Sequence, residues 1–194
     1  MASGARKTKT WPLIVLGVAS VALITILLLS QPTTPLYFFL HAAALLGYLM
    51  IFFASVSSIY LRELVRWLGR PFIQTHHFIS IAGLVMITLH PILVAIAFRN
   101  PAVFVPDFRS PMAFLQAGGR LGLYLLFVAA LAALIRKAIG PHWRYVHWLT
   151  YLTFWLGTIH AILIGPNVQS RPVRDLYVAL ALVLVYVLVR RRLT

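Results

Sequence analysis

Long apolar runs alternate with short polar segments along the whole chain. A helix needs about 20 predominantly apolar residues to cross a bilayer, and six of the runs meet or approach this length. The pattern predicts an all-α fold: a bundle of six transmembrane helices that form a single integral-membrane domain over residues 1–194. The expected spans are 11–29, 36–61, 75–98, 119–135, 145–164 and 173–189.

The first apolar run has features of both a membrane span and a secretory signal peptide. It follows the basic residues Arg6, Lys7 and Lys9, as either segment would. Its length exceeds the usual apolar core of a signal peptide, and no A-x-A cleavage motif follows it. We therefore expect a span that is retained.

The basic residues predict the orientation of the six spans. Of the 17 Lys and Arg residues, 12 fall in the two termini and in the loops after the second and fourth spans. The remaining five, on the opposite side, are Arg99, Arg109, Arg120, Arg171 and Arg174. Cytoplasmic loops carry the excess of Lys and Arg, so we expect both termini in the cytoplasm and the chain in a plasma or bacterial inner membrane.

The composition excludes several other classes of protein. Hydrophobic residues make up 61% of the chain, whereas soluble domains are about 45–50% apolar. The net charge of +14 would suit nucleic acid, but the basic residues lie in short loops, where they contact lipid headgroups. We expect membrane lipid and no nucleic acid as a partner. The absence of cysteine excludes disulfides, iron–sulfur clusters and thiolate-ligated or covalently attached haem.

Four histidines lie inside two of the predicted spans at nearly matching depths. His76 and His90 belong to the third span, and His147 and His160 to the fifth. Ionisable side chains inside a membrane are costly and usually functional. If both termini are cytoplasmic, these two spans run parallel, and helical rises of about 19–21 Å bring His76 level with His147 and His90 level with His160. The pattern predicts axial ligands for two stacked b-type haems between the third and fifth helices.

Helical phase ranks the candidate ligands. His76 and His90 are 14 residues apart, which is within about 40° of four full turns. His77 shares this face poorly and is the alternative ligand. The 13-residue step from His147 to His160 leaves a mismatch of about 140° on an ideal helix, so we expect a local distortion of the fifth span near Gly157.

Histidines at matched depths also suit a proton or metal transporter, and single histidines often only pack. A transporter usually places carboxylates beside them, but Glu63, Asp107 and Asp175 are the only acidic residues and lie in loops or at span ends. Haem is therefore the favoured interpretation. His41 is expected to pack between helices and His142 to lie at the membrane interface.

Further residues are candidates for supporting roles. Arginine side chains suit the propionate groups of haem, although contact with lipid headgroups is an equal alternative. The candidates are Arg66, Arg70 and Arg144 on the inner side and Arg99, Arg109 and Arg120 on the outer side. Phe154 and Trp155 lie midway between His147 and His160, either between the haems or facing lipid. The proline- and phenylalanine-rich loop 99–118 is expected to lie on the membrane surface or to cover the outer end of the bundle, where it packs or docks a partner.

The residues around the four histidines resemble the ferric-reductase-like transmembrane domain family. The family includes ferric reductases, NADPH oxidases and the haem-binding membrane subunit of the periplasmic methionine sulfoxide reductase system. The resemblance covers residues 70–165 and rests on His-x13-His from His76 to His90 and on G-x-H-W-x-x-x-H-x-x-x-Y, which begins at Gly140. Members of this family bind haem through two histidines that are 13 residues apart, as His147 and His160 are here. The chain has His76-His77 where the methionine sulfoxide reductase subunit carries two arginines, which leaves the subfamily open.

The resemblance implies a haem b electron carrier that works with separate partners. The expected donor is a cytoplasmic flavoprotein or a quinol, and the expected acceptor is a periplasmic reductase such as the molybdopterin methionine sulfoxide reductase. No flavin or nicotinamide motif is evident, so we expect a redox subunit without a catalytic residue of its own. The alternative is the core of a direct ferric or oxygen reductase that works with a separate flavoprotein.

Overall fold

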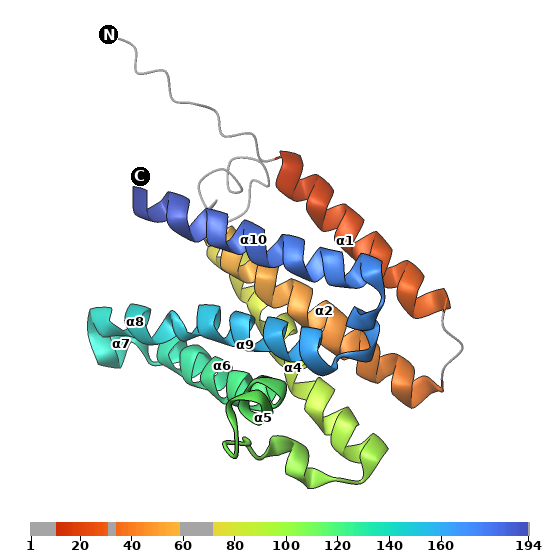
Figure 1. Ribbon diagram of the computed structural model, residues 1–194. Coiled ribbons are helices and arrows are strands. Elements are labelled where there is room, and N and C mark those ends of the chain that lie inside the picture. The colour runs from red at the N-terminus through yellow and green to blue at the C-terminus, as the bar shows by residue number, and fades with distance from the viewer. Residues whose placement is uncertain (1–10, 31–33, 59–71, 194) are drawn as a thin grey trace.

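The computed structural model describes residues 11–30, 34–58 and 72–193, and every regular element within these ranges is a helix (Figure 1). The long helices are α1 (Trp11–Ser30), α2 (Pro35–Ser57), α4 (Phe72–Phe98), α6 (Gly118–Leu134), α9 (Leu149–Ile164) and α10 (Arg171–Leu193). The short ones are η1 (Pro101–Phe104), α5 (Pro111–Gln116), α7 (Arg136–Ile139), η2 (Gly140–His142), α8 (Trp143–His147) and η3 (Pro166–Gln169).

A long helix lies at each of the six predicted positions. By length and composition, three of them in the described part of the chain are able to cross a membrane: Pro35–Ser57, Gln74–Phe98 and Arg171–Arg190. A fourth span is counted if α6 and the helical segment 136–164, which are bent by 76° at their break, are taken together. The all-helical prediction is confirmed, and three to four helices are suited to a membrane. The count of six spans stays a prediction.

Helix α2 lies at the centre of the bundle and packs against α1, α4, α9 and α10 (Figure 1). The inner face of α10 repeats at helical spacing, and every member of it is buried: Val173, Leu176, Tyr177, Leu180, Leu184 and Val187. A stripe with this i, i+3, i+4, i+7 period is typical of a helix with one packed face. The core therefore runs along α2, α9 and α10.

Three stacked aromatic rings hold this core together. Tyr48 of α2 lies 4.0 Å from Tyr177 of α10 and 4.8 Å from Phe154 of α9, measured between ring centroids. The Tyr48 hydroxyl also shares a 2.9 Å hydrogen bond with the Thr158 hydroxyl, which donates to the Phe154 carbonyl. A buried tyrosine needs such a partner because an unpaired hydroxyl in an apolar interior is costly.

Helices α2 and α4 cross with their backbones in close approach. A Cβ atom built on Gly47 would lie 3.0 Å from the side chain of Ile87 and 3.1 Å from its backbone nitrogen. A Cβ atom built on Gly83 would lie 3.0 Å from the Cβ of Met50. Small residues at such crossings are typical of helix pairs in membranes, because they let the backbones pack closely.

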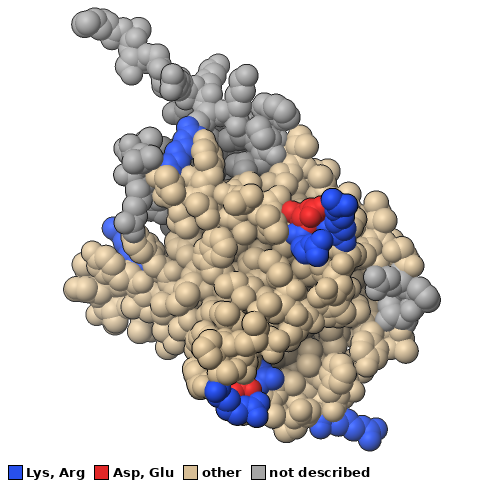
Figure 2. Space-filling view, viewed as in Figure 1, with Lys and Arg blue, Asp and Glu red and all other residues tan. Residues whose placement is uncertain are grey.

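The opposite face of α4 carries large apolar side chains with no protein cover. This stripe comprises Phe78, Ile81, Val85, Leu89, Ile92 and Ile96, all of them exposed. The rest of the visible surface is also nearly free of charge, and Lys and Arg gather in a few small groups near its rim (Figure 2). An apolar surface of this extent on a helix suits contact with lipid.

The loop between α4 and α6 folds against α6. Arg120 donates to the Val105 carbonyl at 2.6 Å, and the Tyr124 hydroxyl donates to the Phe104 carbonyl at 2.9 Å. Helix α5 packs against α9. Of the two predicted placements of this loop, the structure therefore favours a cover over one end of the bundle.

The buried position of Phe154 predicts a large loss of stability on truncation. Its side chain is 2% exposed and stacks on Tyr48, so Phe154→Ala leaves a cavity and should cost on the order of 3 kcal/mol. Phe127→Ala is the matched control, because that side chain is 42% exposed. Thermal unfolding in detergent should show a much lower midpoint for the first variant. Equal effects of the two variants would contradict this packing.

Candidate functional site

His76 and His147 lie side by side at one end of the bundle. Their ring centroids are 6.4 Å apart and the ring planes meet at 71°. His147 ends α8, and its Nδ1 is 3.1 Å from the Ala129 carbonyl of α6. Trp143, one turn earlier in α8, places its ring 5.5 Å from that of His147. The structure thus brings together the two histidines that the spacing pairs at the inner level.

His90 and His160 form the second level, toward the other ends of α4 and α9. The His90 Nδ1 lies 3.4 Å from the Leu40 carbonyl of α2, and the His160 Nδ1 lies 2.5 Å from the Gln116 carbonyl at the end of α5.

Helix α2 runs antiparallel to α4, since Gly47 lies against Ile87 and Gly83 against Met50. It also runs antiparallel to α9, since Tyr48 meets Thr158 and Phe52 meets Phe154. Helices α4 and α9 therefore run parallel.

Three of these four histidines share one hydrogen-bonding pattern. In His90, His147 and His160 the Nδ1 atom faces a backbone carbonyl of another helix. A carbonyl only accepts, so each Nδ1 carries the proton and donates. The neutral ring then has its lone pair on Nε2. This is the arrangement in which proteins present histidine to a metal, since the second ring nitrogen is normally held by a carbonyl or carboxylate.

The structure distinguishes His76 from its neighbour His77. His76 is half-buried and faces His147, and its Nε2 lies 3.4 Å from the Ser80 hydroxyl. His77 is exposed, with its ring 6.2 Å from that of His76. Helical phase ranks these two residues in the same order.

The helical distortion expected near Gly157 lies at Trp148 instead. Helix α9 is continuous from Leu149 to Ile164, whereas Trp148 separates it from α8. The Tyr151 amide donates to the Trp148 carbonyl at 3.0 Å, a bond across three residues that belongs to a tighter turn. A tight turn directly after His147 rotates this histidine relative to His160. The location at Gly157 was wrong, because α9 keeps its helical form through Gly157 and the three-residue bond is at Trp148.

A glycine leaves room beside the His160 ring. A Cβ atom built on Gly119 of α6 would lie 3.0 Å from the His160 Cδ2 and 3.1 Å from its Nε2. Any larger residue would meet the face of the imidazole at the nitrogen that carries the lone pair. Sequence spacing gave no signal for Gly119, because it depends on how α6 and α9 pack.

The candidate propionate partners lie in different surroundings, and their role stays a prediction. Arg109 is bound to Asp107 by a 2.6 Å ion pair, and Arg120 donates to a loop carbonyl, so both outer arginines have protein partners. Arg99 ends α4 in the left-handed conformation, with φ at 49°. Arg144 is exposed in α8. Arg66 and Arg70 lie outside the described residues.

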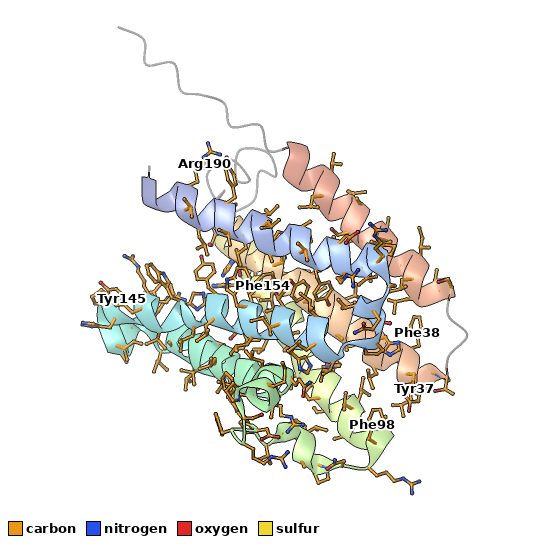
Figure 3. All side chains as sticks on the ribbon, in the orientation of Figure 1. Tyr37, Phe38, Phe98, Tyr145, Phe154 and Arg190 are labelled. Carbon is orange, nitrogen blue, oxygen red and sulfur yellow. The ribbon has the colours of Figure 1, made fainter. Side chains whose placement is uncertain are left out.

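Phe154 and Trp155 differ in burial: Phe154 is buried and Trp155 is half-buried. Phe154 stacks within the α2–α9–α10 core, in the middle of the bundle (Figure 3). The lipid-facing placement was wrong, because the Phe154 side chain is buried against Tyr48 of α2; a placement between the haems stays a prediction. Trp155 is half-buried, with its ring edge against Phe154.

The remaining histidines are peripheral. His41 is half-buried in α2, near the ring of Tyr37, and interacts electrostatically with His90. His142 is exposed beside Tyr145, which Figure 3 places at the opposite end of the bundle from Tyr37 and Phe98. Among the described residues, no group of three or more His, Cys, Asp or Glu side chains is arranged to hold a metal ion.

Comparisons with models of protein families, with curated proteins and with solved structures find no match to this chain.

The Asp107–Arg109 pair predicts an unusual titration in the loop between α4 and α6. Hydrogen bonds from Arg109 lower the pKa of the Asp107 carboxyl from 3.8 to about 2. A lowered pKa means that the pair is intact above pH 3.8 and is lost as the pH falls through about 2. Carboxylate NMR should show Asp107 still ionised at about pH 3. Arg109→Gln should return the pKa toward 3.8, whereas Arg174→Gln should not. Titration of the unmodified protein near 3.8 would disprove the pair.

Proposed function

We propose that the chain is a membrane b-type cytochrome that carries electrons across the bilayer through two haems. Each haem would be held by one histidine of α4 and one of the α8–α9 segment. His76 and His147 would be the inner axial ligands, and His90 and His160 the outer ones. The observation that carries the proposal is the placement of His76 against His147.

The spacing of these two rings fits one metal ion between them. Imidazole nitrogens bind transition metals at about 2.0–2.1 Å, so two imidazoles on opposite sides of one ion have centroids about 6–6.5 Å apart. The observed separation is 6.4 Å. Bis-histidine ligation of one ion requires an approach of this kind.

The hydrogen bonds at Nδ1 support the same conclusion. The carbonyls of Leu40, Ala129 and Gln116 fix the rings of three of the four histidines. A donated Nδ1 proton raises the basicity of Nε2 and orients the ring, which strengthens ligation. Bound haem would supply one-electron redox chemistry, and its potential would depend on these ligands and on burial.

The two histidine levels are separated along the membrane normal in this proposal. His76 and His90 lie about 21 Å apart along α4 at 1.5 Å per residue, which is most of the thickness of a hydrocarbon core. Six spans with both termini in the cytoplasm would place His76 and His147 at the inner side. Arg144 and Arg70 are the candidate propionate partners there.

The proposed partners follow from the resemblance to ferric-reductase-like membrane domains. A cytoplasmic flavoprotein or a quinol would reduce the inner haem. A periplasmic reductase would accept electrons from the outer haem. In the described residues, the ends of the bundle carry exposed groups rather than a substrate-binding cleft that we can identify. The protein is therefore proposed as an electron-transfer subunit of an oxidoreductase.

A reduced-minus-oxidised spectrum of the purified chain tests the proposal. We expect b-type bands and about two haems per polypeptide, because each level offers two axial ligands. His90→Ala and His76→Ala should each remove about half of the haem. His77→Ala and His142→Ala are matched controls that should retain it. A chain without b-type bands, or full haem in both ligand variants, would overturn the assignment.

Gly119→Ala should selectively weaken the outer haem site. The added methyl group would meet His160 at Cδ2 and Nε2, at 3.0 and 3.1 Å, so the ring must move by several tenths of an ångström to reach ordinary contact at about 3.5–4.0 Å. Gly157→Ala is the control, because nothing lies within 4 Å of its added Cβ. Haem content should fall toward one per chain in the first variant only. Equal haem content in both would contradict the role of Gly119.

A further inference from the structure

The close crossing of α2 and α4 lies midway between His76 and His90 along α4. Gly83 is seven residues from both His76 and His90, and so shares a helical face with them. On α2, the central Gly47 is likewise seven residues from Leu40 and from Ala54. The two helices are antiparallel, since Gly47 lies against Ile87 and Gly83 against Met50.

One end of this crossing joins a histidine of α4 to the backbone of α2, where the His90 Nδ1 faces the Leu40 carbonyl at 3.4 Å. At the other end His76 and Ala54 occupy the matching positions, seven residues from Gly83 and from Gly47. The distance between α2 and α4 at the two glycines therefore governs the His90 contact.

The hydrogen bond between His90 and the Leu40 carbonyl is already so long that a small increase in the helix separation would break it. Hydrogen bonds of this type extend to about 3.2 Å and are weak beyond that, so 3.4 Å is already long. A Cβ at residue 83 would start 3.0 Å from the Cβ of Met50, whereas carbon atoms pack best at about 3.5–4.0 Å. Relief of this contact moves the helices apart by about 0.5 Å or more, and the bond to Leu40 is then lost.

We propose that α2 is a positioning element for the histidines of α4, and that the Gly47–Gly83 crossing sets the tautomer of His90. With the crossing closed, the Leu40 carbonyl holds the proton on Nδ1 and leaves Nε2 free to bind a metal. With the crossing opened, the proton redistributes between the two nitrogens and the ring loses its fixed direction. The consequence for haem rests on the proposed function, but the tautomer of His90 does not.

The test measures histidine tautomers by ¹⁵N NMR of the haem-free full chain in lipid nanodiscs, because iron bound at Nε2 would itself keep the proton on Nδ1. Spectra are recorded near pH 8, where histidines are neutral because their pKa is about 6.5. In the unmodified protein we expect Nδ1–H to predominate at His90. Loss of one hydrogen bond should lower the ratio of Nδ1–H to Nε2–H by about twofold to tenfold. We expect this change in Gly83→Ala and in Gly47→Ala.

Two controls separate positioning from general loosening. Gly157→Ala adds a methyl group in open space and should leave His90 unchanged. His160 is bonded to Gln116 rather than to α2, so its ratio should stay constant in all three variants. An unchanged His90 in folded Gly83→Ala and Gly47→Ala, or parallel changes at His90 and His160, would overturn the proposal. If neither variant folds, the unmodified protein decides, because a His90 without a predominant Nδ1–H form overturns it as well.

A second readout follows if the chain binds haem. Gly83→Ala should then shift the midpoint potential assigned to the outer haem, and Gly157→Ala should not. A chain that binds no haem but shows the predicted tautomer changes would refute the proposed function and uphold the positioning role. A chain that binds haem but shows unchanged tautomers in its haem-free form would uphold the proposed function and refute the positioning role.

Discussion

A polar ring nitrogen inside an apolar helical bundle must find a partner within the protein, because no water is at hand to satisfy it. Here the partner is a backbone carbonyl, and carbonyls in the middle of a helix are already engaged in helical hydrogen bonds through one of two lone pairs. Three of the four histidines face such a carbonyl on another element: Leu40 within α2, Ala129 within α6 and Gln116 at the end of α5. This constraint fixes which helices must be neighbours and where glycine is needed between them.

On α9 the residues that pack in the core and the histidine that hydrogen-bonds to another helix lie in different parts of the helix. One half of α9 faces the aromatic core, where Phe154 stacks against Tyr48 and Tyr177 joins them. The other half carries His160 beside Gly119. Helix α4 is divided in the same way, with Gly83 and His90 toward α2 and an apolar stripe on the outside. In α9 the packing face and the histidine face are therefore distinct, whereas in α4 the histidine lies on the face that packs against α2.

The sequence alone predicts the helices well, because an apolar run of bilayer length has few alternatives to a helix. It also predicts the pairing of His76 with His147, since helical rise is constant and depth follows from residue number. The direction in which a side chain points around the helix axis is harder to predict from the sequence. The break at Trp148, the inward turn of Phe154 and the ion pair of Arg109 with Asp107 all depend on which neighbour a side chain meets, and residue spacing carries no such information.

We propose that two haem centres lie one above the other between α4 and the α8–α9 segment. Pulsed electron paramagnetic resonance of the oxidised full-length protein measures their separation directly. Two low-spin ferric haems about 20 Å apart are expected, from the helical rise between His76 and His90. A protein with no ferric haem signal, or with a single centre, would contradict the account.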